Sequence, residues 1–345
     1  MRPPELDGTP FRTVVIGGGT GLPVVLRGLK PFVGREVEQL TGIVTVTDDG
    51  GSSGRLRRDF GVLPPGDIRN CIVALADDEA VLSRLFQYRF PTGEGLSGHS
   101  FGNLLLTALT GITGDFYQAI LTAESILSVR GKVLPATLSD GRLKARGASG
   151  KVYLGESAVG NAGEPLAEVA LDPPSPAAFG PAVKALEDAD LILLGPGSLY
   201  TSILPNLLIP GILAAVRRSG APVVLVLNLM TQPGETDAMS ALDHLEALER
   251  HAGEALVHQV LVHGGPWPRA CLEAYALTGS MPLALKPELL EARGVRVVER
   301  DLLADCELLR HDPGKLGRAV LDLGAETLRT RRPALKEIRG GRALP

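Results

Sequence analysis

A glycine-rich segment near the start of the chain lies where a strand is expected to end and a helix to begin. Residues 13–16 are a short β-branched run, and the helix-like VVLRGLK follows the segment. The segment contains Gly17, Gly18, Gly19, Thr20 and Gly21. Backbone N–H groups in such a turn can approach phosphate oxygens, because no Cβ is in the way. This spacing predicts a phosphate-binding loop, with a purely structural tight turn as the alternative.

The same loop departs from two better-known phosphate-binding motifs. Leu22 stands where the dinucleotide fingerprint requires glycine or alanine, which disfavours NAD as the ligand. No Gly-Lys-Ser/Thr sequence closes the loop, so a Walker A site is excluded. The loop therefore predicts a nucleotide or another phosphate-bearing ligand without fixing which one.

Two adjacent carboxylates follow a second β-rich run, residues 41–47. Asp48 and Asp49 begin the sequence DDGGSSG, which also supplies the hydroxyls of Ser52 and Ser53. Carboxylates at the end of a parallel strand can bind Mg²⁺ or ribose hydroxyls. We predict Asp48 and Asp49 as metal ligands on this basis, although Asp-Asp-Gly-Gly is equally typical of a turn.

Two further polar clusters precede apolar helical runs. Asp67, Arg69 and Asn70 stand before CIVALADD, where the guanidinium could hold a phosphate and Asp67 could cap the helix. In GHSFGN, polar groups gather at the start of the apolar helix LLLTALTGIT. The residues of this second anion cradle are His99, Ser100 and Asn103.

GHSFG also matches the nucleophile elbow of serine hydrolases, and this keeps a hydrolase as a minor alternative. An elbow needs a strand directly before it. The sequence before it, FPTGEGLS, is not typical of a buried strand, so we expect Ser100 to belong to the anion cradle at the helix N-terminus and not to be a nucleophile.

Later strands repeat the same scheme and define the fold class. Residues 191–194, 223–229 and 259–263 are β-rich, and each precedes a polar or glycine-rich loop and then a helix-like stretch. The first of these loops contains Gly195, Gly197 and Ser198. Strands that alternate with helices predict an α/β, Rossmann-like, doubly wound and mostly parallel sheet. Ligands bind at the carboxyl ends of such strands, so the loops are expected to converge.

The core is expected to be interrupted in the sequence. Residues 11–128 and 176–328 carry the two parts of a nucleotide-binding core. Residues 129–175 alternate β-rich pieces with Asp-Gly and Ser-Gly turns, which predicts a small antiparallel β insertion. The basic, Gly- and Pro-containing residues 329–345 are predicted to be a flexible tail.

Composition restricts the cell compartment and the partners. The 345 residues include 35 basic and 39 acidic side chains, a formal net charge of −4, which gives no reason to expect a nucleic-acid binder. The three cysteines form no CxxC pair, and no apolar run reaches the roughly 18 residues of a membrane span. We therefore predict a cytoplasmic protein with no membrane span.

Taken in order, the motifs resemble those of the YvcK/CofD-like family, in particular its bacterial branch of gluconeogenesis factors. The resemblance covers about residues 13–323 and rests on GGGTGLP, TVTDDGGSSGRLR, PPGDIRN, GHSFGNLLL, GPGSLYTSILPNLL and NLMTQPGET. It implies a Rossmann-like fold and a regulatory protein that binds a UDP-sugar, such as UDP-N-acetylglucosamine, in carbon metabolism and cell-shape control. It also implies that Tyr275 contacts the base and Arg310 a phosphate.

The related CofD branch implies a different function. Its members transfer 2-phospho-L-lactate with a divalent metal, so a CofD-like transferase that uses a nucleotide-activated substrate stays open as the alternative. The long segment TDDGGSSGRLRRDFGVLPPGDIRN is more similar to the bacterial gluconeogenesis branch. Partners left open by the resemblance are a second copy of the chain and cell-wall or carbon-metabolism regulatory proteins.

Overall fold

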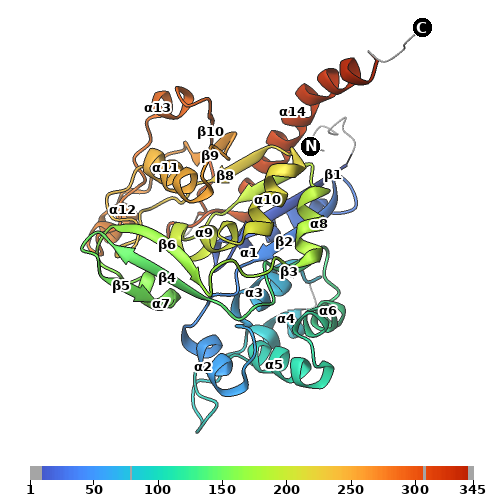
Figure 1. Ribbon diagram of the computed structural model, residues 1–345, viewed down its shortest axis with the longest axis vertical. Coiled ribbons are helices and arrows are strands. Elements are labelled where there is room, and N and C mark those ends of the chain that lie inside the picture. Colours follow the sequence, from blue (N-terminus) through green and yellow to red (C-terminus); the bar gives the residue numbers. More distant parts are fainter. Residues whose placement is uncertain (1–9, 78–79, 306–307, 341–345) are drawn as a thin grey trace.

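The computed structural model describes residues 10–77, 80–305 and 308–340 (Figure 1). A seven-stranded, entirely parallel sheet forms its centre, with the order β10-β9-β8-β7-β1-β2-β3. Its strands are β1 (Phe11–Gly17), β2 (Val37–Val44), β3 (Lys132–Pro135), β7 (Leu191–Leu194), β8 (Val223–Val226), β9 (Gln259–His263) and β10 (Arg296–Arg300).

Helices cover both faces of this sheet, because successive residues of each buried strand point to opposite sides. In β1, Val14 and Ile16 join one apolar core, and Val15 joins the other. The first core is closed by α8 (Gly180–Glu187), α9 (Leu204–Leu207), α10 (Pro210–Ser219) and α11 (Ala241–Ala252). The second is closed by α1 (Gly21–Leu29), α3 (Gly66–Leu75), α6 (Phe116–Leu127) and α14 (Pro313–Gly340).

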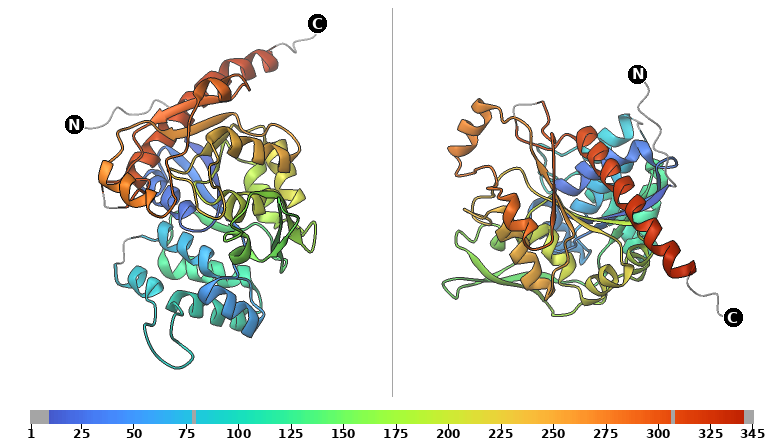
Figure 2. Two further views of the ribbon diagram at one scale, coloured as in Figure 1. Left: turned by 90° about the vertical axis from the view of Figure 1, so that its left-hand side faces the viewer. Right: turned by 90° about the horizontal axis from the view of Figure 1, so that it is seen from above.

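The remaining elements lie around the ends and edges of the sheet, as the two further views show (Figure 2). They are η1 (Lys30–Phe32), α2 (Gly51–Phe60), α4 (Ala80–Gln87), α5 (Phe101–Thr113), η2 (Leu199–Ile203), α12 (Arg269–Ala276) and α13 (Pro287–Glu291). A separate antiparallel sheet has the order β5-β4-β6. It consists of β4 (Arg142–Gly147), β5 (Val152–Leu154) and β6 (Leu166–Asp172), with the short helix α7 (Glu156–Val159) after β5.

The predicted α/β fold, with a parallel sheet and a small antiparallel sheet, is confirmed. Three details differ from the sequence expectation. The segment 129–175 contributes β3 to the main sheet, where it pairs with β2, so the antiparallel sheet itself begins at Arg142. The pattern did not single out β10, because three of its five residues are charged. The expected tail boundary at 329 falls inside α14, which continues to Gly340.

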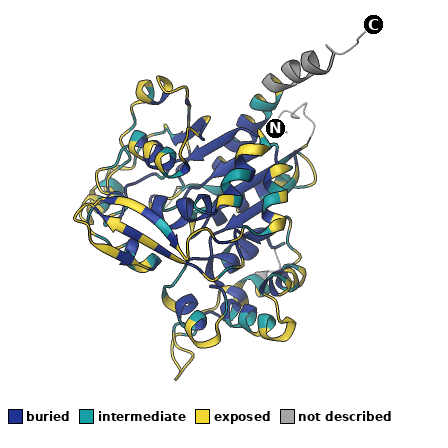
Figure 3. Ribbon diagram, in the orientation of Figure 1, coloured by how far each residue is buried: buried dark blue, intermediate teal, exposed yellow. Residues whose placement is uncertain are grey.

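The antiparallel sheet packs one face onto the body of the protein and leaves the other open. Its inward side chains, such as Leu143, Tyr153 and Val169, belong to the same core as β1 and β7. Val152 and Leu154 are exposed on the outer side (Figure 3). This alternation is typical of an antiparallel sheet with one solvated face.

Within the described ranges, no single helix is long and apolar enough to cross a membrane. The helical segments Leu199–Leu207 and Pro210–Ser219 reach the length and composition of a membrane span only when they are taken together, and they are bent by 76° relative to each other.

Helices α1 and α14 cross so closely that each needs glycine at the crossing. A Cβ on Gly28 would overlap the carbonyl of Pro313, and one on Gly317 would overlap the carbonyl of Gly28. We expect Gly28→Ala to lower the free energy of unfolding by about 1–3 kcal/mol, the usual cost of overpacking. Gly111→Ala is the control, since a Cβ there meets nothing within 4 Å and should stabilise α5 by about 0.5 kcal/mol. Urea unfolding of both variants would measure this, and equal effects would contradict it.

Candidate functional site

The loops that follow β1 and β7 lie at the point where the strand order reverses. β1 pairs with β2 on one side and with β7 on the other, so the chain winds outward in both directions from this pair. In open α/β sheets a crevice forms at such a switch point, outside the carboxyl ends of the strands. Two glycine-rich loops therefore border one crevice.

These two loops touch through backbone atoms, and this explains several of their glycines. A Cβ on Gly21 would overlap the carbonyl of Pro196. A Cβ on Gly18 would lie 2.6 Å from Cγ2 of Thr45 and 2.9 Å from Oδ2 of Asp67. Gly19 has φ +59°, a left-handed conformation that favours glycine. These contacts explain the glycines by structure alone. They do not by themselves indicate a phosphate site.

A pocket of about 480 Å³ opens between the two loops. Eight predicted site residues line it: Gly18, Gly19, Thr20, Gly21, Gly197, Ser198, Tyr275 and Arg310. Other lining residues are Ser202 in η2, Asn228 and Gln232 after β8, Ser280 after α12 and His311 before α14. The predicted convergence of the loops after β1, β7 and β8 is therefore observed at one pocket.

One end of the pocket is suited to an anion. Helix α1 begins at Gly21 without a side-chain cap and has no acidic residue in its first turn. Its first N–H groups thus lack a side-chain acceptor and carry the positive end of the helix dipole. Because Thr20 and Gly21 line the pocket, a phosphate there would meet these donors.

Another part of the pocket lining is apolar and carries a cation. Tyr275 packs against a small cluster formed by Leu229, Met230, Leu303 and Leu309. Arg310 is exposed beside it, with no ion pair to any residue in the described part of the chain. An aromatic face next to a free guanidinium is a combination that can contact a nucleobase and a charged group.

A hydrogen-bonded floor joins the loops after β7 and β8. Asn228 accepts a hydrogen bond from the Gly197 N–H (2.9 Å) and donates one to the Gly197 carbonyl (2.9 Å). Gln232 donates to Oγ of Ser198 at 2.7 Å. These bonds fix the shape of the floor and occupy the Gly197 N–H, so α1 supplies the free backbone donors.

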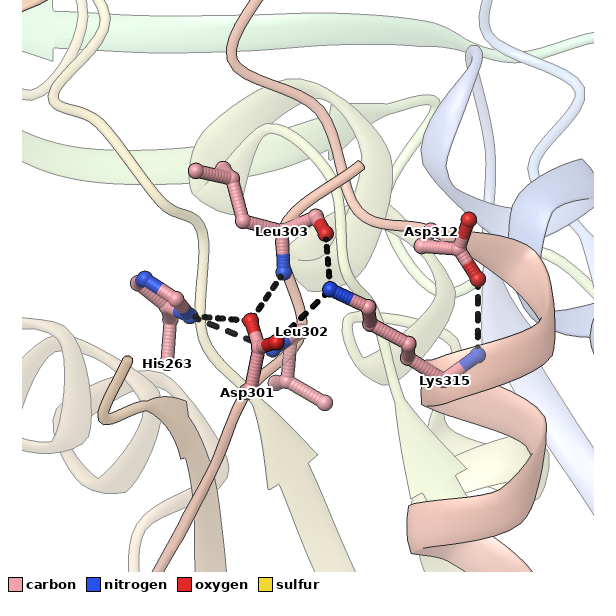
Figure 4. A network of polar contacts seen from close by, with 6 residues as sticks. All are labelled: His263, Asp301, Leu302, Leu303, Asp312 and Lys315. Atoms are coloured by element: carbon pink, nitrogen blue, oxygen red, sulfur yellow. Dashed lines mark hydrogen bonds and ion pairs between the residues drawn. The ribbon is translucent and has the colours of Figure 1, made fainter. Parts of the chain in front are cut away.

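The segment that carries Arg310 and His311 is anchored at both ends (Figure 4). Lys315 Nζ donates to Oδ2 of Asp301 at 2.7 Å and to the carbonyl of Leu303 at 2.9 Å. The Leu302 N–H donates to Nδ1 of His263 at 3.1 Å. The hydrogen bond from Lys315 also lowers the pKa of Asp301, so the anchor is a charged pair.

His311 was not predicted from the sequence. Burial lowers the pKa of its imidazole to about 4, so the ring is neutral at pH 7. Its Nε2 is shielded from solvent and has no partner among the described residues. It directly follows the predicted residue Arg310 but lies in no motif, and the fold brings both residues to the pocket that Tyr275 also lines.

Two buried acids lie next to the first glycine loop. Asp67, in α3, accepts the Gly19 N–H on Oδ2 at 2.6 Å. Burial raises the pKa of its carboxyl to about 6, and the nearby Asp48 adds to the increase. Glu156, in α7, accepts a hydrogen bond from Thr47 Oγ1 at 3.0 Å, and burial raises its pKa well above the usual range. Sequence analysis missed Glu156 because it lies in the insertion, far from every motif.

Asp48 and Asp49, the predicted metal ligands, are both engaged within the protein. Asp48 Oδ1 accepts the Gly50 N–H at 2.9 Å, and Asp49 Oδ1 accepts the N–H and the hydroxyl of Ser157 at 2.9 and 2.7 Å. The described residues contain no group of three or more His, Cys, Asp or Glu side chains that could hold a metal ion. A metal here would thus need oxygen atoms from the ligand to complete its coordination.

Gly17 and Gly195 adjoin each other where β1 and β7 end, and the remaining predicted site residues form a polar cluster near the start of α5. Ser52 Oγ pairs with Nδ1 of His99 at 2.9 Å and accepts from Nδ2 of Asn103 at 3.2 Å. Arg69 donates to Ser100 Oγ and to Oδ1 of Asn70. None of these residues lines the 480 Å³ pocket. Ser53 is buried as well and accepts the Gly66 N–H at 3.1 Å.

Ser100 caps the N-terminus of α5. It has an extended backbone, accepts the Asn103 N–H at 3.2 Å at the start of α5, and is fully buried. An elbow nucleophile must be exposed on a strained turn. This geometry therefore does not support the serine hydrolase alternative.

The fold and the pocket define a doubly wound α/β protein with a pocket between two glycine-rich loops at the switch point of its sheet. Comparison with known proteins agrees with this class. Residues 13–303 match the family model described as 2-phospho-L-lactate transferase CofD. The chain belongs to this CofD family.

Relatives with high identity come from bacteria. The chain is 46% identical over 310 residues to the gluconeogenesis factor of Halalkalibacterium halodurans, covering 90% of this chain and 95% of the relative. It is 43% identical over 313 residues to that of Bacillus subtilis, covering 90% and 98%. A solved structure of a Bacillus halodurans protein of the UPF0052 family has a TM-score of 0.87 and 45% identity, and the match covers 91% of this chain and all of that one.

The buried carboxyl of Asp67 predicts a pH dependence of stability. Its pKa is about 6 in the folded chain and about 3.9 when unfolded, so the folded state binds the proton more tightly. The resulting stabilisation is complete below pH 4 and is lost as the pH rises through 6. Relative to Asp67→Asn, the wild type should lose about 3 kcal/mol of unfolding free energy between these limits. Chemical unfolding at several pH values measures the difference, and parallel profiles for the two proteins would refute it.

Proposed function

We propose that this chain binds a nucleotide sugar of the UDP-sugar class in the pocket between the glycine loops. The single observation that carries the proposal is the arrangement of the pocket. The uncapped start of α1 lines the pocket together with Tyr275 and Arg310. A UDP-sugar has matching parts, since its diphosphate is anionic and its uracil offers a flat face.

The names of the relatives support a regulatory role for this binding. Proteins more than 40% identical to the chain over nearly its whole length are named gluconeogenesis factors. We propose that the chain is a cytoplasmic regulator of carbon metabolism and of cell shape, with its nucleotide sugar as the signal. Carbon-metabolism and cell-wall regulatory proteins would be its partners.

A CofD-like transferase is the second candidate, and the family match favours it. The structure offers one feature in its support: Asp67 and Glu156 place buried carboxyls with raised pKa values beside the glycine loop. Such groups could exchange a proton with a substrate. A binding protein should return UDP-N-acetylglucosamine unchanged after incubation with Mg²⁺, whereas release of a nucleotide product would favour the transferase.

We expect Tyr275→Ala and Arg310→Ala each to weaken binding of UDP-N-acetylglucosamine. Loss of the aromatic face or of a charged hydrogen bond should raise Kd at least about tenfold. Arg269→Ala is the matched control, because Arg269 lies in the same helix as Tyr275 and pairs only with Glu273 on the surface. Calorimetric titration gives the affinities. Unchanged affinity in both pocket variants, with a thermal midpoint like that of the wild type, would place the nucleotide elsewhere.

We also propose that Mg²⁺ strengthens binding by joining Asp48 to the diphosphate. Mg²⁺ takes oxygen ligands and is commonly bound by one or two carboxylates together with phosphates. Asp48→Asn should therefore abolish the effect of Mg²⁺ on the Kd of UDP-N-acetylglucosamine. Asp49→Asn should retain it, because Asp49 is bound to Ser157. The same stimulation by Mg²⁺ in both variants and in the wild type would remove the metal from the account.

A further inference from the structure

Three arginines surround the segment that precedes α5, outside the nucleotide pocket. Arg55 donates to the carbonyl of Ser97 at 2.8 Å, and Arg89 donates to the carbonyl of Gly98 at 2.5 Å. Arg69 donates to Oγ of Ser100, two residues further on. We call Arg55, Arg69 and Arg89 the arginine cluster. None of its members lines the 480 Å³ pocket.

The arginine cluster has no counter-ion within the described part of the chain. No carboxylate lies within 4.0 Å of any of its three guanidinium groups, although ion pairs occur at fourteen other places. Their neutral partners are the two carbonyls, Ser100 and Oδ1 of Asn70. In a protein with a net charge of −4, three adjacent cations with no ion-pair partner among the described residues are an uncommon local excess.

The burial of Arg69 makes this local excess of positive charge unfavourable. Its residue is only 8% exposed, and its Nε has no hydrogen-bond partner. Burial, the largest cause, and the nearby Arg89 lower the pKa of its guanidinium, and this outweighs the opposite effect of the charges of Asp67 and Asp48. A buried cation normally has a carboxylate partner, because desolvation otherwise costs several kcal/mol. Asn103, only 2% exposed, adds an unpartnered Oδ1 to the same cluster.

The glycines of GHSFG make room for these cations. A Cβ on Gly98 would lie 3.0 Å from Nη2 of Arg55, and Gly98 has φ +79°. A Cβ on Gly102 would lie 2.8 and 2.9 Å from Cδ and Cγ of Arg69. The motif therefore holds two guanidinium groups beside the N-terminus of α5, a thirteen-residue helix with no acid in its first turn.

We propose that the arginine cluster is a second anion site, which binds a phosphoryl group and is separate from the nucleotide pocket. Several guanidinium groups together suit a phosphoryl group, which carries up to two negative charges and three acceptor oxygens. Arg55 and Arg89 would meet it from the surface, and Arg69 would supply the desolvated charge. The ligand is inorganic phosphate or the phosphate monoester of a small metabolite. This site does not depend on the nucleotide proposal.

Titration of the full chain with sodium phosphate, in chloride-matched buffer, tests the site by calorimetry. Arg89→Ala should raise the Kd of phosphate at least about tenfold, as expected for loss of a charged hydrogen bond. Arg300→Ala should not change it, and this control is matched, because Arg300 is also exposed and donates to one carbonyl, that of Glu299. Glucose 6-phosphate in a second titration separates the two sources: tighter binding than inorganic phosphate identifies a monoester.

Arg69→Gln provides an independent readout that a purely structural arginine would not give. Removing a desolvated charge that has no direct ion-pair partner should raise the thermal midpoint in phosphate-free buffer while abolishing the phosphate response. A lower midpoint would identify Arg69 as structural and overturn the site. So would the absence of phosphate binding by the wild type, or equal affinity in the wild type and Arg89→Ala.

UDP-N-acetylglucosamine titrations of the same variants separate this site from the nucleotide pocket. Arg89→Ala should keep the wild-type affinity for the nucleotide sugar, and Tyr275→Ala should keep that for phosphate. If Arg89→Ala weakens both ligands equally, the cluster belongs to the nucleotide pocket and the second site is refuted. If phosphate binds and the nucleotide sugar does not, only the proposed function fails.

Discussion

The close approach of two loops at the centre of the sheet is the constraint on which the site depends. Gly21 leaves space for the carbonyl of Pro196, and Gly18 leaves space for Thr45 and Asp67. Any side chain at either glycine would separate the loops after β1 and β7 or displace α3. Because the loops meet through their backbones, the uncapped start of α1 is held at the wall of a pocket whose floor comes from β7 and β8.

The antiparallel insertion is tied to the same region through polar contacts. Glu156 accepts a hydrogen bond from the hydroxyl of Thr47, and Ser157 donates two hydrogen bonds to Asp49. Farther away, the Val169 N–H donates to Nε2 of His251 at 3.1 Å. The insertion thus holds the loop after β2 in place and brings one buried acid close to Asp67. Its role near the site is to position that loop.

Sequence patterns predicted the elements that are built from strong local signals. Short apolar runs predicted β7 and β9 with the observed bounds, and glycine loops at strand ends predicted part of the pocket wall. The sequence predicts β3 as part of the insertion, because it is only four residues long and lies near an Asp-Gly turn. Nothing in these four residues indicates that they pair with β2 in a parallel sheet. His311 and Glu156 lack any motif, since tertiary contacts alone bring them to the site. Asp49, predicted as a metal ligand, instead accepts hydrogen bonds from Ser157. Ser157 lies in the insertion, more than 100 residues further along the chain, so the sequence around Asp49 does not reveal this contact.

The most direct test of the central claim is a crystal structure of the chain with UDP-N-acetylglucosamine. We expect the diphosphate to lie within hydrogen-bond distance of the N–H group of Thr20 or Gly21, and the uracil to pack against Tyr275. Nucleotide density outside the crevice between β1 and β7, with the first turn of α1 left in solvent, would contradict it.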